Sequence, residues 1–321
     1  MQSDRKFEKL RNLQKFGPAP HHLMATRRQV LKYGGAAAFA ATAPLPVLIA
    51  EHRQLPARPI PGTLESLPVI GMGNSRAFRS GDPHASWDVM KIFQRYGSRY
   101  VDCAGDSRFV VADVVAQREL GGRVFLGTYF DVDDEARARD EAARLLAKTG
   151  KPALDLMQAY PETAVPHWRT FRRWKEEGLA RHVGVARHRS DYYPVMMQLM
   201  ATGTVDVLQV NYSLMEPEAE ERILPMARDL GVAVVINRPF ANGAWFRVTR
   251  GRKLPPWAAE FDCDSWAQFS LKFILSHPAV TCVLTETANP RHAVDNIGGG
   301  FGPLPDAKTR RRMRALVRDL A

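Results

Sequence analysis

The sequence VDVLQVNYSLMEPEAEERILPMARDLGVAVVI, residues 205–236, decides the fold. It opens with an apolar run, Val205–Val210, and closes with another, Val232–Ile236. Between them, Glu216–Leu230 places apolar residues at the three- and four-residue spacing of an amphipathic helix. Nearly continuous apolar strands on either side of a helix are typical of a βαβ unit, in which parallel strands are buried on both faces.

The same unit repeats along the chain from residue 67 onward. Further helices are predicted at Glu135–Lys148 and at Trp168–Glu177, which ends before Gly178. Eight strand–helix repeats in one domain favour an α/β fold of the TIM type, a closed (β/α)8 barrel with eight parallel strands. The eight predicted strands are Leu67–Ile70, Arg99–Cys103, Val124–Thr128, Leu154–Gln158, His182–Val185, Val205–Val210, Val232–Ile236 and Val280–Leu284.

A doubly wound open sheet is the alternative fold. That fold carries a Gly-x-Gly-x-x-Gly turn between its first strand and a helix. Here Gly71-Met72-Gly73 is followed by Asn74, Ser75 and Arg76, and we expect no helix at that point. The barrel is therefore favoured.

Barrel enzymes carry their chemistry at the carboxyl ends of the strands. The residues that follow the apolar runs are therefore the first candidates for a site. They include Asp102, Tyr129, Tyr160, Ala186, Arg187, Gln209, Asn211, Asn237, Arg238, Thr285 and Glu286.

The net charge of +11 is concentrated near the N-terminus. Residues 1–50 hold eight Lys and Arg against only Asp4 and Glu8, so more than half of the net charge belongs to this segment. The composition, 45% apolar and 25% charged, excludes a disordered or collagen-like chain. Of the three cysteines, Cys103 and Cys282 lie in apolar runs and are expected in the core, and no pair has metal-binding spacing.

The segment that contains Arg27 and Arg28 predicts export. Residues 26–32 read TRRQVLK and precede an uncharged stretch, residues 33–50, with an Ala-x-Ala at 41–43. This is the order of a removable signal, and the paired arginines resemble the twin-arginine export signal. The resemblance implies a periplasmic or other extracytoplasmic location, the twin-arginine translocon as a partner, and a boundary between a signal region, 1–50, and a barrel, 51–321. The alternative is a tethering helix that is never cleaved.

The apolar stretch of this segment is too short and too rich in Gly and Ala for a stable membrane span. The segment before Arg27 is long for a signal and contains Met24. We expect that translation can start at Met24.

A second basic cluster lies near the C-terminus, with Leu316 and Leu320 at helical spacing. A nucleic-acid-binding face would interleave basic and aromatic residues. We interpret this cluster as the solvated face of a terminal helix and expect no nucleic-acid partner. Its members are Arg310, Arg311, Arg312, Arg314 and Arg318.

Five short motifs, taken in order, resemble the aldo/keto reductases, and the likeness runs from about Leu67 to Asn296. They imply an NADP-dependent oxidoreductase barrel that reduces a carbonyl on a small molecule. The motifs are LPVIGMG at 67–73, VDCA at 101–104, Glu-Gly at 177–178 with Gly-Val at 184–185, QVNY at 209–212, and NPR at 289–291 with Asp-Asn at 295–296.

The family's chemistry uses an Asp, a Tyr as general acid, a Lys that lowers the pKa of that Tyr, and a His that orients the carbonyl. A phenol with a pKa near 10 donates its proton poorly at neutral pH unless a cation tunes it. By position, Asp102 matches the Asp, Ser107 stands at the Tyr, Tyr129 at the Lys and Tyr160 at the His. Asp102, without a Lys partner, should keep a raised pKa if it is buried.

Realignment does not restore the tetrad. Residues 92–147 contain no Lys, residues 85–166 no His, and residues 101–128 no Tyr. The three residue types are therefore absent from the whole regions in which the resemblance places them.

The resemblance also implies a changed nicotinamide site. Ala186 and Arg187 stand where the family has the Ser and Asn that hold the carboxamide, and Asn237 stands where an aromatic ring stacks on the nicotinamide. Glu286 replaces a Gly near the phosphates, where a carboxylate is repulsive. The residues that remain to hold NADP are Gln209, Asn211, Asn237, Arg238, Thr285, Arg291 and Asn296.

Two functional hypotheses follow. In the first, the protein is a nicotinamide-dependent oxidoreductase in which Tyr129 or Tyr160, near Asp102, has taken over the acid role. In the second, the barrel is non-catalytic and binds a small molecule or another protein at the same mouth. No metal site is expected, because the histidines are scattered without ligand spacing and only His188 follows a strand end.

Overall fold

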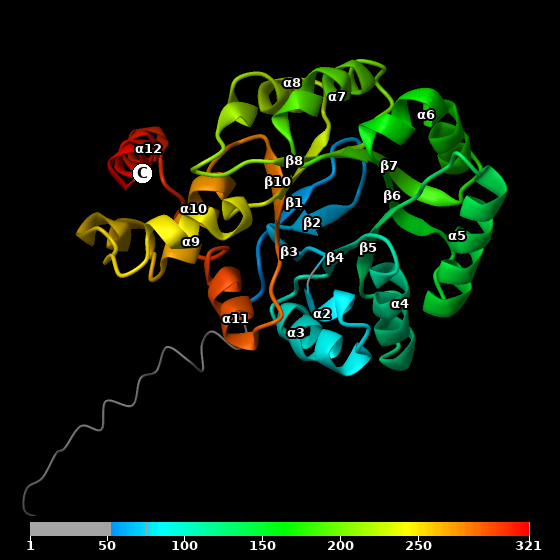
Figure 1. Cartoon of the computed structure of the whole chain (residues 1–321), viewed down its shortest axis with the longest axis horizontal. Coiled ribbons are helices and arrows are strands. Elements are labelled where there is room, and N and C mark those ends of the chain that lie inside the picture. The colour runs from blue at the N-terminus through cyan, green and yellow to red at the C-terminus, as the bar shows by residue number, and fades with distance from the viewer. Residues whose placement is uncertain (1–52, 75, 321) are drawn as a thin grey trace, which may run out of the picture. The chain divides into compact units, whose positions relative to one another are not determined.

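The computed structural model describes residues 53–74 and 76–320. In this part of the chain eight parallel strands close a barrel, and helices surround it (Figure 1). Each strand lies beside its neighbours in the sequence, and β10 returns to pair with β3. The predicted parallel eight-stranded TIM barrel is confirmed. Its strands are β3 (Ile70–Met72), β4 (Tyr100–Cys103), β5 (Phe125–Tyr129), β6 (Leu154–Ala159), β7 (Ala180–Ala186), β8 (Val207–Asn211), β9 (Ala233–Asn237) and β10 (Val280–Thr285).

Polar side chains begin several of the surrounding helices. Asp82, Asp134, Ser265 and Asn289 each accept a hydrogen bond from a backbone N–H of the first turn, which satisfies a donor that has no partner inside the helix. The helices are α2 (Arg76–Arg79), α3 (Pro83–Arg95), α4 (Ser107–Gln117), α5 (Glu135–Thr149), α6 (Pro161–Glu176), α7 (Tyr193–Met200), α8 (Ile223–Asp229), α9 (Ala244–Val248), α10 (Trp266–Leu275), α11 (Pro290–Gly298) and α12 (Ala307–Leu320).

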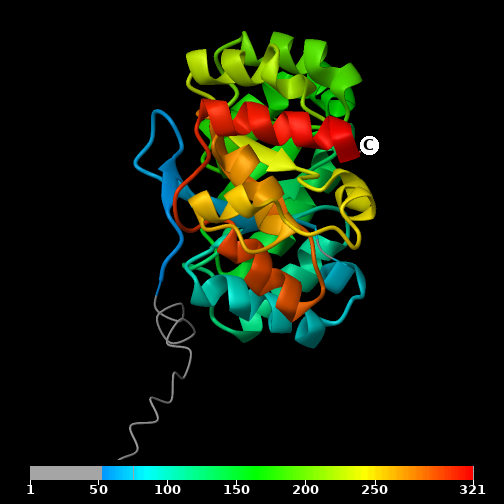
Figure 2. The same ribbon diagram turned by 90° about the vertical axis from the view of Figure 1, so that its left-hand side faces the viewer.

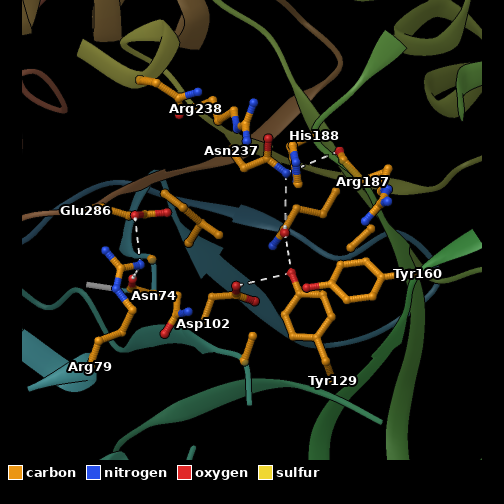
Figure 3. A pocket seen from close by; sticks show the side chains of 16 residues that line it. Asn74, Arg79, Asp102, Tyr129, Tyr160, Arg187, His188, Asn237, Arg238 and Glu286 are labelled. Atoms are coloured by element: carbon orange, nitrogen blue, oxygen red, sulfur yellow. Dashed lines mark hydrogen bonds and ion pairs between the residues drawn. The ribbon is translucent and has the colours of Figure 1, made fainter. Parts of the chain in front are cut away.

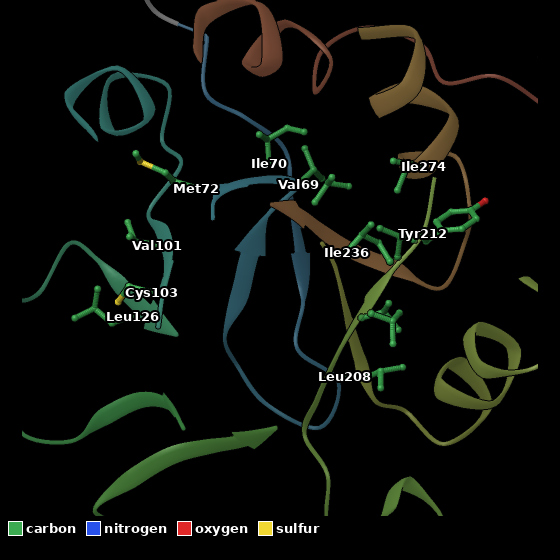
Figure 4. Packing of buried hydrophobic residues seen from close by; sticks show 14 of the residues in the cluster. Val69, Ile70, Met72, Val101, Cys103, Leu126, Leu208, Tyr212, Ile236 and Ile274 are labelled. Atoms are coloured by element: carbon green, nitrogen blue, oxygen red, sulfur yellow. The ribbon is translucent and has the colours of Figure 1, made fainter. Parts of the chain in front are cut away.

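Alternation along the strands divides the core into two layers. In β4, Val101 and Cys103 belong to the layer between the strands and the helices (Figure 4), whereas Tyr100 packs inside the barrel. Asp102 also points inward, because a Cβ added at Gly127 of the neighbouring strand would lie 2.7 Å from its Oδ1. The two-residue period of a strand therefore delivers the Asp102 carboxyl to the barrel interior.

A hairpin covers the N-terminal end of the barrel (blue in Figure 2). Its strands, β1 (Ala57–Pro59) and β2 (Ser66–Pro68), pair antiparallel, and the buried Ile60 and Leu67 pack with the inward-facing residues of the strand beginnings. The predicted first strand, Leu67–Ile70, is thus wrong in its bounds. Leu67 belongs to the hairpin, and the barrel strand begins at Ile70, because Pro68 has no N–H to continue a ladder.

Three helix predictions also need correction. The helix expected at Trp168 begins earlier, at Pro161, because proline suits the first turn of a helix. The helix expected over Glu216–Leu230 is divided into a 3-10 turn, Glu218–Glu220, and α8, whose first turn contains Pro225. A four-residue helix, α2, follows Asn74 where we expected none.

The terminal helix α12 uses part of its basic cluster for packing. Met313 and Val317 are buried, while Arg310 donates to the Tyr212 hydroxyl at 2.7 Å and forms an ion pair with Glu220. The prediction of a wholly solvated basic face is therefore wrong for Arg310, because Glu220 and the ring of Phe273 hold its guanidinium.

The predicted signal region, residues 1–50, lies outside the described residues. Within them, no helix has the length and apolar character needed to cross a membrane. Cys103 and Cys282 are buried and free, as expected for core residues, and so is Cys263.

Candidate functional site

The end of the barrel opposite the hairpin holds a cavity of about 390 Å³, which we call the mouth (Figure 3). It lies at the carboxyl ends of the strands, where barrel folds place ligands. Its walls are largely polar and carry charges of both signs. The lining residues are Gly73, Asn74, Arg79, Asp102, Ala104, Tyr129, Tyr160, Ala186, Arg187, His188, Gln209, Asn237, Arg238, Asn242, Leu284 and Glu286.

Asp102 is the buried carboxyl of the mouth, with 4% of its surface exposed. Gln158 donates to it through Nε2 at 2.7 Å, and the hydroxyls of Tyr100 and Tyr129 lie 3.3 Å from its oxygens. In the described part of the chain it forms no ion pair with Lys, Arg or His. Burial raises the pKa of Asp102 to about 7, and the four neutral side chains that face it, including Gln209, offset only part of that rise.

Tyr129 lies between Asp102 and Gln209. Its hydroxyl is within hydrogen-bond distance of Asp102 Oδ2 and of Gln209 Oε1, so its single proton serves one of two acceptors. Burial, followed by the negative charge of Asp102, raises the pKa of Tyr129 well above its usual value. This phenol therefore holds its proton more firmly than a free tyrosine does.

Tyr160 stacks on Tyr129, with 5.2 Å between the ring centroids, and leaves 38% of its surface exposed. Burial and then the charge of Asp102 raise the pKa of Tyr160 as well, while Arg187 opposes the rise. Neither phenol of the mouth is therefore tuned toward acidity.

Arg187 is held rigidly on the wall beside Tyr160. Its guanidinium lies over the rings of Tyr160 at 5.0 Å and Tyr192 at 4.6 Å, and Nη2 pairs with Glu162 at 2.6 Å. The neighbouring His188 has a pKa lowered by burial and then by the positive charges of Arg238 and Arg187. This wall of the mouth is therefore electropositive.

Arg238 begins a strained loop at the rim. Arg238, Ala241 and Asn242 have φ values of 51°, 45° and 53°, and they are three of the five non-glycine residues with positive φ in the described chain. Such backbone costs on the order of 1 kcal/mol per residue and is concentrated at ligand-binding sites in proteins. Within the described residues the guanidinium of Arg238 forms no ion pair.

Glu286 faces the mouth from the end of β10, and its side chain is about half exposed. A Cβ at Gly73 would lie 2.9 Å from the Cγ of Glu286, so the glycine makes room for this carboxylate. Partial burial raises the pKa of Glu286, while Arg79, 3.9 Å away, and Arg238 oppose the rise.

Of the eleven residues to which the sequence assigned a catalytic or NADP-binding role, the mouth brings together six: Asp102, Tyr129, Tyr160, Gln209, Asn237 and Arg238. The other five lie outside its lining. Ser107 is buried in the first turn of α4, and Thr285 is buried beside Gly71. Asn211 is tied to Tyr193 and Glu216, Arg291 is exposed on α11, and Asn296 lines a neighbouring cavity of about 430 Å³.

Sequence reasoning missed Asn74 and Arg79, which reach the mouth from the segment around α2. Arg187 and Glu286 were candidates because they follow apolar runs, but no binding role was predicted for them, and His188 was noted only as a histidine after a strand. Their position directly after an apolar run was the signal that places them at the mouth. No group of His, Cys, Asp and Glu side chains in the described part of the chain is arranged to hold a metal ion.

Comparisons with known proteins agree on the fold. The model of the aldo/keto reductase family matches residues 70–312. The NADH-specific methylglyoxal reductase of Escherichia coli is 22% identical over 216 residues, which are 57% of this chain and 64% of that protein. This chain therefore matches less than two thirds of that relative's length.

Solved structures with the same fold share little sequence with this chain. An aldo/keto reductase from Klebsiella pneumoniae in complex with NADP and acetate is 20% identical, with a TM-score of 0.62, and covers 80% of this chain and 93% of its own. An aldo-keto reductase from Bacillus halodurans in its holo form is 18% identical, with a TM-score of 0.65, and covers 84% and 97%. The glycerol dehydrogenase of Gluconobacter oxydans is 16% identical, with a TM-score of 0.64, and covers 83% and 96%.

Proposed function

This chain belongs to the aldo/keto reductase family, and we propose that it is an exported member whose mouth binds a small molecule while its NADP-dependent carbonyl reduction is weak or absent. In this proposal the barrel is retained as a binding scaffold. Three of the family's four catalytic groups, the Tyr, the Lys and the His, have been replaced, and Asp102 matches the fourth.

One observation carries the proposal: the buried Asp102 has only neutral partners, and the phenol beside it has a raised pKa. A carbonyl that accepts hydride must also accept a proton, and general acid catalysis contributes roughly 10²–10⁴-fold to such reactions. A phenol whose hydroxyl lies beside a carboxyl and hydrogen-bonds to no cation among the described residues is a poor proton donor at neutral pH. Tyr129 stands where the family has its Lys, so this position supplies no cation, and its own phenol donates a proton poorly.

The other replaced positions support the same conclusion. Ser107, at the position of the family's Tyr, is buried in α4 and does not line the mouth. A serine hydroxyl is also a much weaker acid than a phenol. Tyr160, at the position of the His, is stacked on Tyr129 and keeps a raised pKa.

The residues of the mouth do not fit a nicotinamide ring. Ala186 offers no polar side-chain atom, and Arg187, which pairs with Glu162 and lies over two tyrosine rings, places a charged guanidinium where the family has an amide. Glu286 brings a carboxylate to the rim, where it would repel a pyrophosphate. We therefore assign no hydride-transfer step to this chain.

A second candidate function, a reductase with relocated acid chemistry, has one observation in its favour. The pKa of Asp102 is about 7, so at neutral pH part of the protein holds a proton on this carboxyl, in contact with Tyr129. A carbonyl bound against Tyr129 would then receive the proton of the Tyr129 hydroxyl, and protonated Asp102 would return a proton to the phenolate. This candidate predicts turnover that declines as the pH rises above about 7.

Steady-state oxidation of NADPH and of NADH by the purified protein separates the two candidates. Methylglyoxal and a panel of simple aldehydes and ketones serve as substrates, and the methylglyoxal reductase of Escherichia coli serves as the positive control. We expect no carbonyl-dependent rate above background. A kcat of ~1 s⁻¹ or more, which is typical of enzymes, would establish the second candidate instead.

Export is proposed from the sequence alone, because Arg27 and Arg28 precede an uncharged stretch with an Ala-x-Ala. Replacing both arginines with lysine keeps the charge and should leave the protein in the cytoplasm. Cell fractionation of wild type and of this double variant measures the effect. Equal export of the two proteins would contradict the twin-arginine route.

A further inference from the structure

The mouth has an excess of positive charge on one side. Arg187, His188 and Arg238 lie along the ends of β7 and β9, which we call the basic wall, and Glu286 lies across the mouth beside Arg79 (Figure 3). The Arg187 guanidinium is neutralised in part by Glu162, whereas Arg238 has no ion-pair partner among the described residues. The basic wall therefore has cationic capacity that the protein itself does not use.

The guanidinium of Arg187 is preorganised by its neighbours in the protein. Two tyrosine rings and Glu162 fix the plane of its guanidinium, so little rotational freedom is lost on binding. One Nη donates to Glu162, while Nε is buried without a partner. A fixed planar fork with unused donors is the geometry that recognises a carboxylate.

Unpaired polar atoms are concentrated in the mouth. The described residues hold eight buried side-chain atoms that lack a hydrogen-bond partner within the protein, and four belong to mouth residues. Burying a polar group without a partner costs free energy, so such atoms indicate a polar ligand. Two of the four are donors that can serve a carboxylate, Arg187 Nε and Gln209 Nε2, and two are acceptors that need a donor from elsewhere, Asn74 Oδ1 and Asn237 Oδ1.

His188 lies within the field of the basic wall. Its pKa is lowered by burial and by Arg238, Arg187 and Arg189, and only Glu162 acts in the opposite direction. A bound anion would relieve this repulsion and would raise the pKa of His188 toward its ordinary value.

We propose that the mouth binds a small monocarboxylate, with its carboxylate on the basic wall against Arg187 and Arg238 and its carbon skeleton against Tyr160, Ala186 and Leu284. One negative charge matches the wall, while a larger or doubly charged group would meet Glu286 across a cavity of about 390 Å³. This inference rests on the proposed function, because it treats the mouth as a binding site that is free of nicotinamide cofactor.

Isothermal titration of the purified full chain with benzoate and with benzamide tests the charge requirement directly. The two probes have the same shape and differ in charge, and no cofactor is added. We expect benzoate to bind at least tenfold more tightly than benzamide and to raise the pKa of His188, followed by NMR. Equal affinities for the two probes would overturn the inference.

Two variants test whether Arg187 provides the positive charge that binds benzoate. Arg187→Gln should weaken benzoate binding at least tenfold and leave benzamide unchanged, and Arg187→Lys, which keeps the charge but not the fork, should give an intermediate loss. The matched control is Arg189→Gln, since Arg189 is exposed, pairs with Asp191 and does not line the mouth. It should change affinity less than twofold. Equal losses in the Gln variants would show a general charge effect and contradict the assigned wall.

The outcome is separable from that of the proposed function, because binding is measured without cofactor and turnover without benzoate. Benzoate binding together with rapid NADPH-dependent reduction would refute the proposed function and leave the basic wall intact. Absence of both would refute the basic wall alone. The benzoate and benzamide comparison on wild type is decisive even if an Arg187 variant fails to fold.

Discussion

The two ends of the barrel treat a buried aspartate in opposite ways. Near the covered end, Asp155 of β6 forms ion pairs with Lys151 at 2.8 Å and with Arg181 at 2.9 Å, and it accepts a hydrogen bond from the backbone N–H of Leu126 at 2.8 Å. At the mouth, Asp102 of β4 is equally buried, yet its partners are amides and phenols. A carboxylate that serves stability is given cations, because an unpaired buried charge is costly. At the mouth, no cation of the described residues offsets the free-energy cost of ionising the buried Asp102.

The mouth contains cations, but they do not pair with Asp102. Arg79, Arg187 and Arg238 all line the cavity, but none forms an ion pair with Asp102. Positive charge therefore lines the cavity without pairing with the carboxyl. This difference between the ends agrees with the proposal that the mouth binds an anion.

Removing Lys151 should lower the free energy of unfolding more than the other changes considered, because it leaves Asp155 buried with one cation fewer. We expect Lys151→Met to lower the free energy of unfolding by about 3 kcal/mol, measured by urea denaturation. The matched control is Lys148→Met, which removes a partly exposed lysine 2.6 Å from Asp113 and should cost under about 1 kcal/mol. Equal losses would show that burial of the Asp155 pair does not matter.

The second largest effect on the free energy of unfolding should be its pH dependence, which we expect from Asp102. Its folded pKa, about 7, lies above its unfolded value, near 4, so the native state binds the extra proton between these values. Stability is therefore greatest below pH 4 for this group and is lost as the pH rises through 7. We expect a loss of roughly 2.5 kcal/mol between pH 5 and pH 8 in urea denaturation.

The variant Asp102→Asn isolates this contribution, because asparagine does not titrate. Its stability should change little over the same pH range, whatever its absolute value. A slope that persists in the variant would assign the pH dependence to other groups and would break the contrast between Asp102 and Asp155.

A cation placed beside Asp102 should make the mouth resemble the covered end. Tyr129→Lys should lower the pKa of Asp102 by roughly 1 to 3 units, as seen for carboxyls beside a positive charge. The shift can be followed by ¹³C NMR of the labelled carboxyl. Tyr160→Lys is the control, since Tyr160 makes no hydrogen bond to Asp102, and it should give the smaller shift. Equal shifts would contradict the specific role of position 129.

The barrel could be predicted because apolar runs and amphipathic helices alternate along the whole chain, a local signal that survives without tertiary information. The same alternation placed Asp102, Tyr129 and Gln209 at strand ends, and these residues line the mouth. The hairpin could not be separated from the first barrel strand, because Leu67 and Ile70 are apolar in both settings.

The details of the site depend on contacts between residues far apart in the sequence. Asn211 follows a strand like its neighbours, but Tyr193 and Glu216 occupy its carboxamide. The clamp on Arg187 needs a ring from the end of β6 and another from the loop before α7, which no local pattern reveals. Arg79 reaches the mouth from a short helix that carries no clear sequence signal.

The contrast between the two ends depends on the protonation of Asp102 in the wild-type protein, since a buried carboxyl without a cation should have a raised pKa. A titration of its labelled carboxyl carbon by ¹³C NMR, assigned with Asp102→Asn, measures it. The account predicts a midpoint near 7, as burial with neutral partners requires. A midpoint at or below the ordinary value near 4 would show that a cation or an equivalent set of donors stabilises the carboxylate, and it would contradict the account.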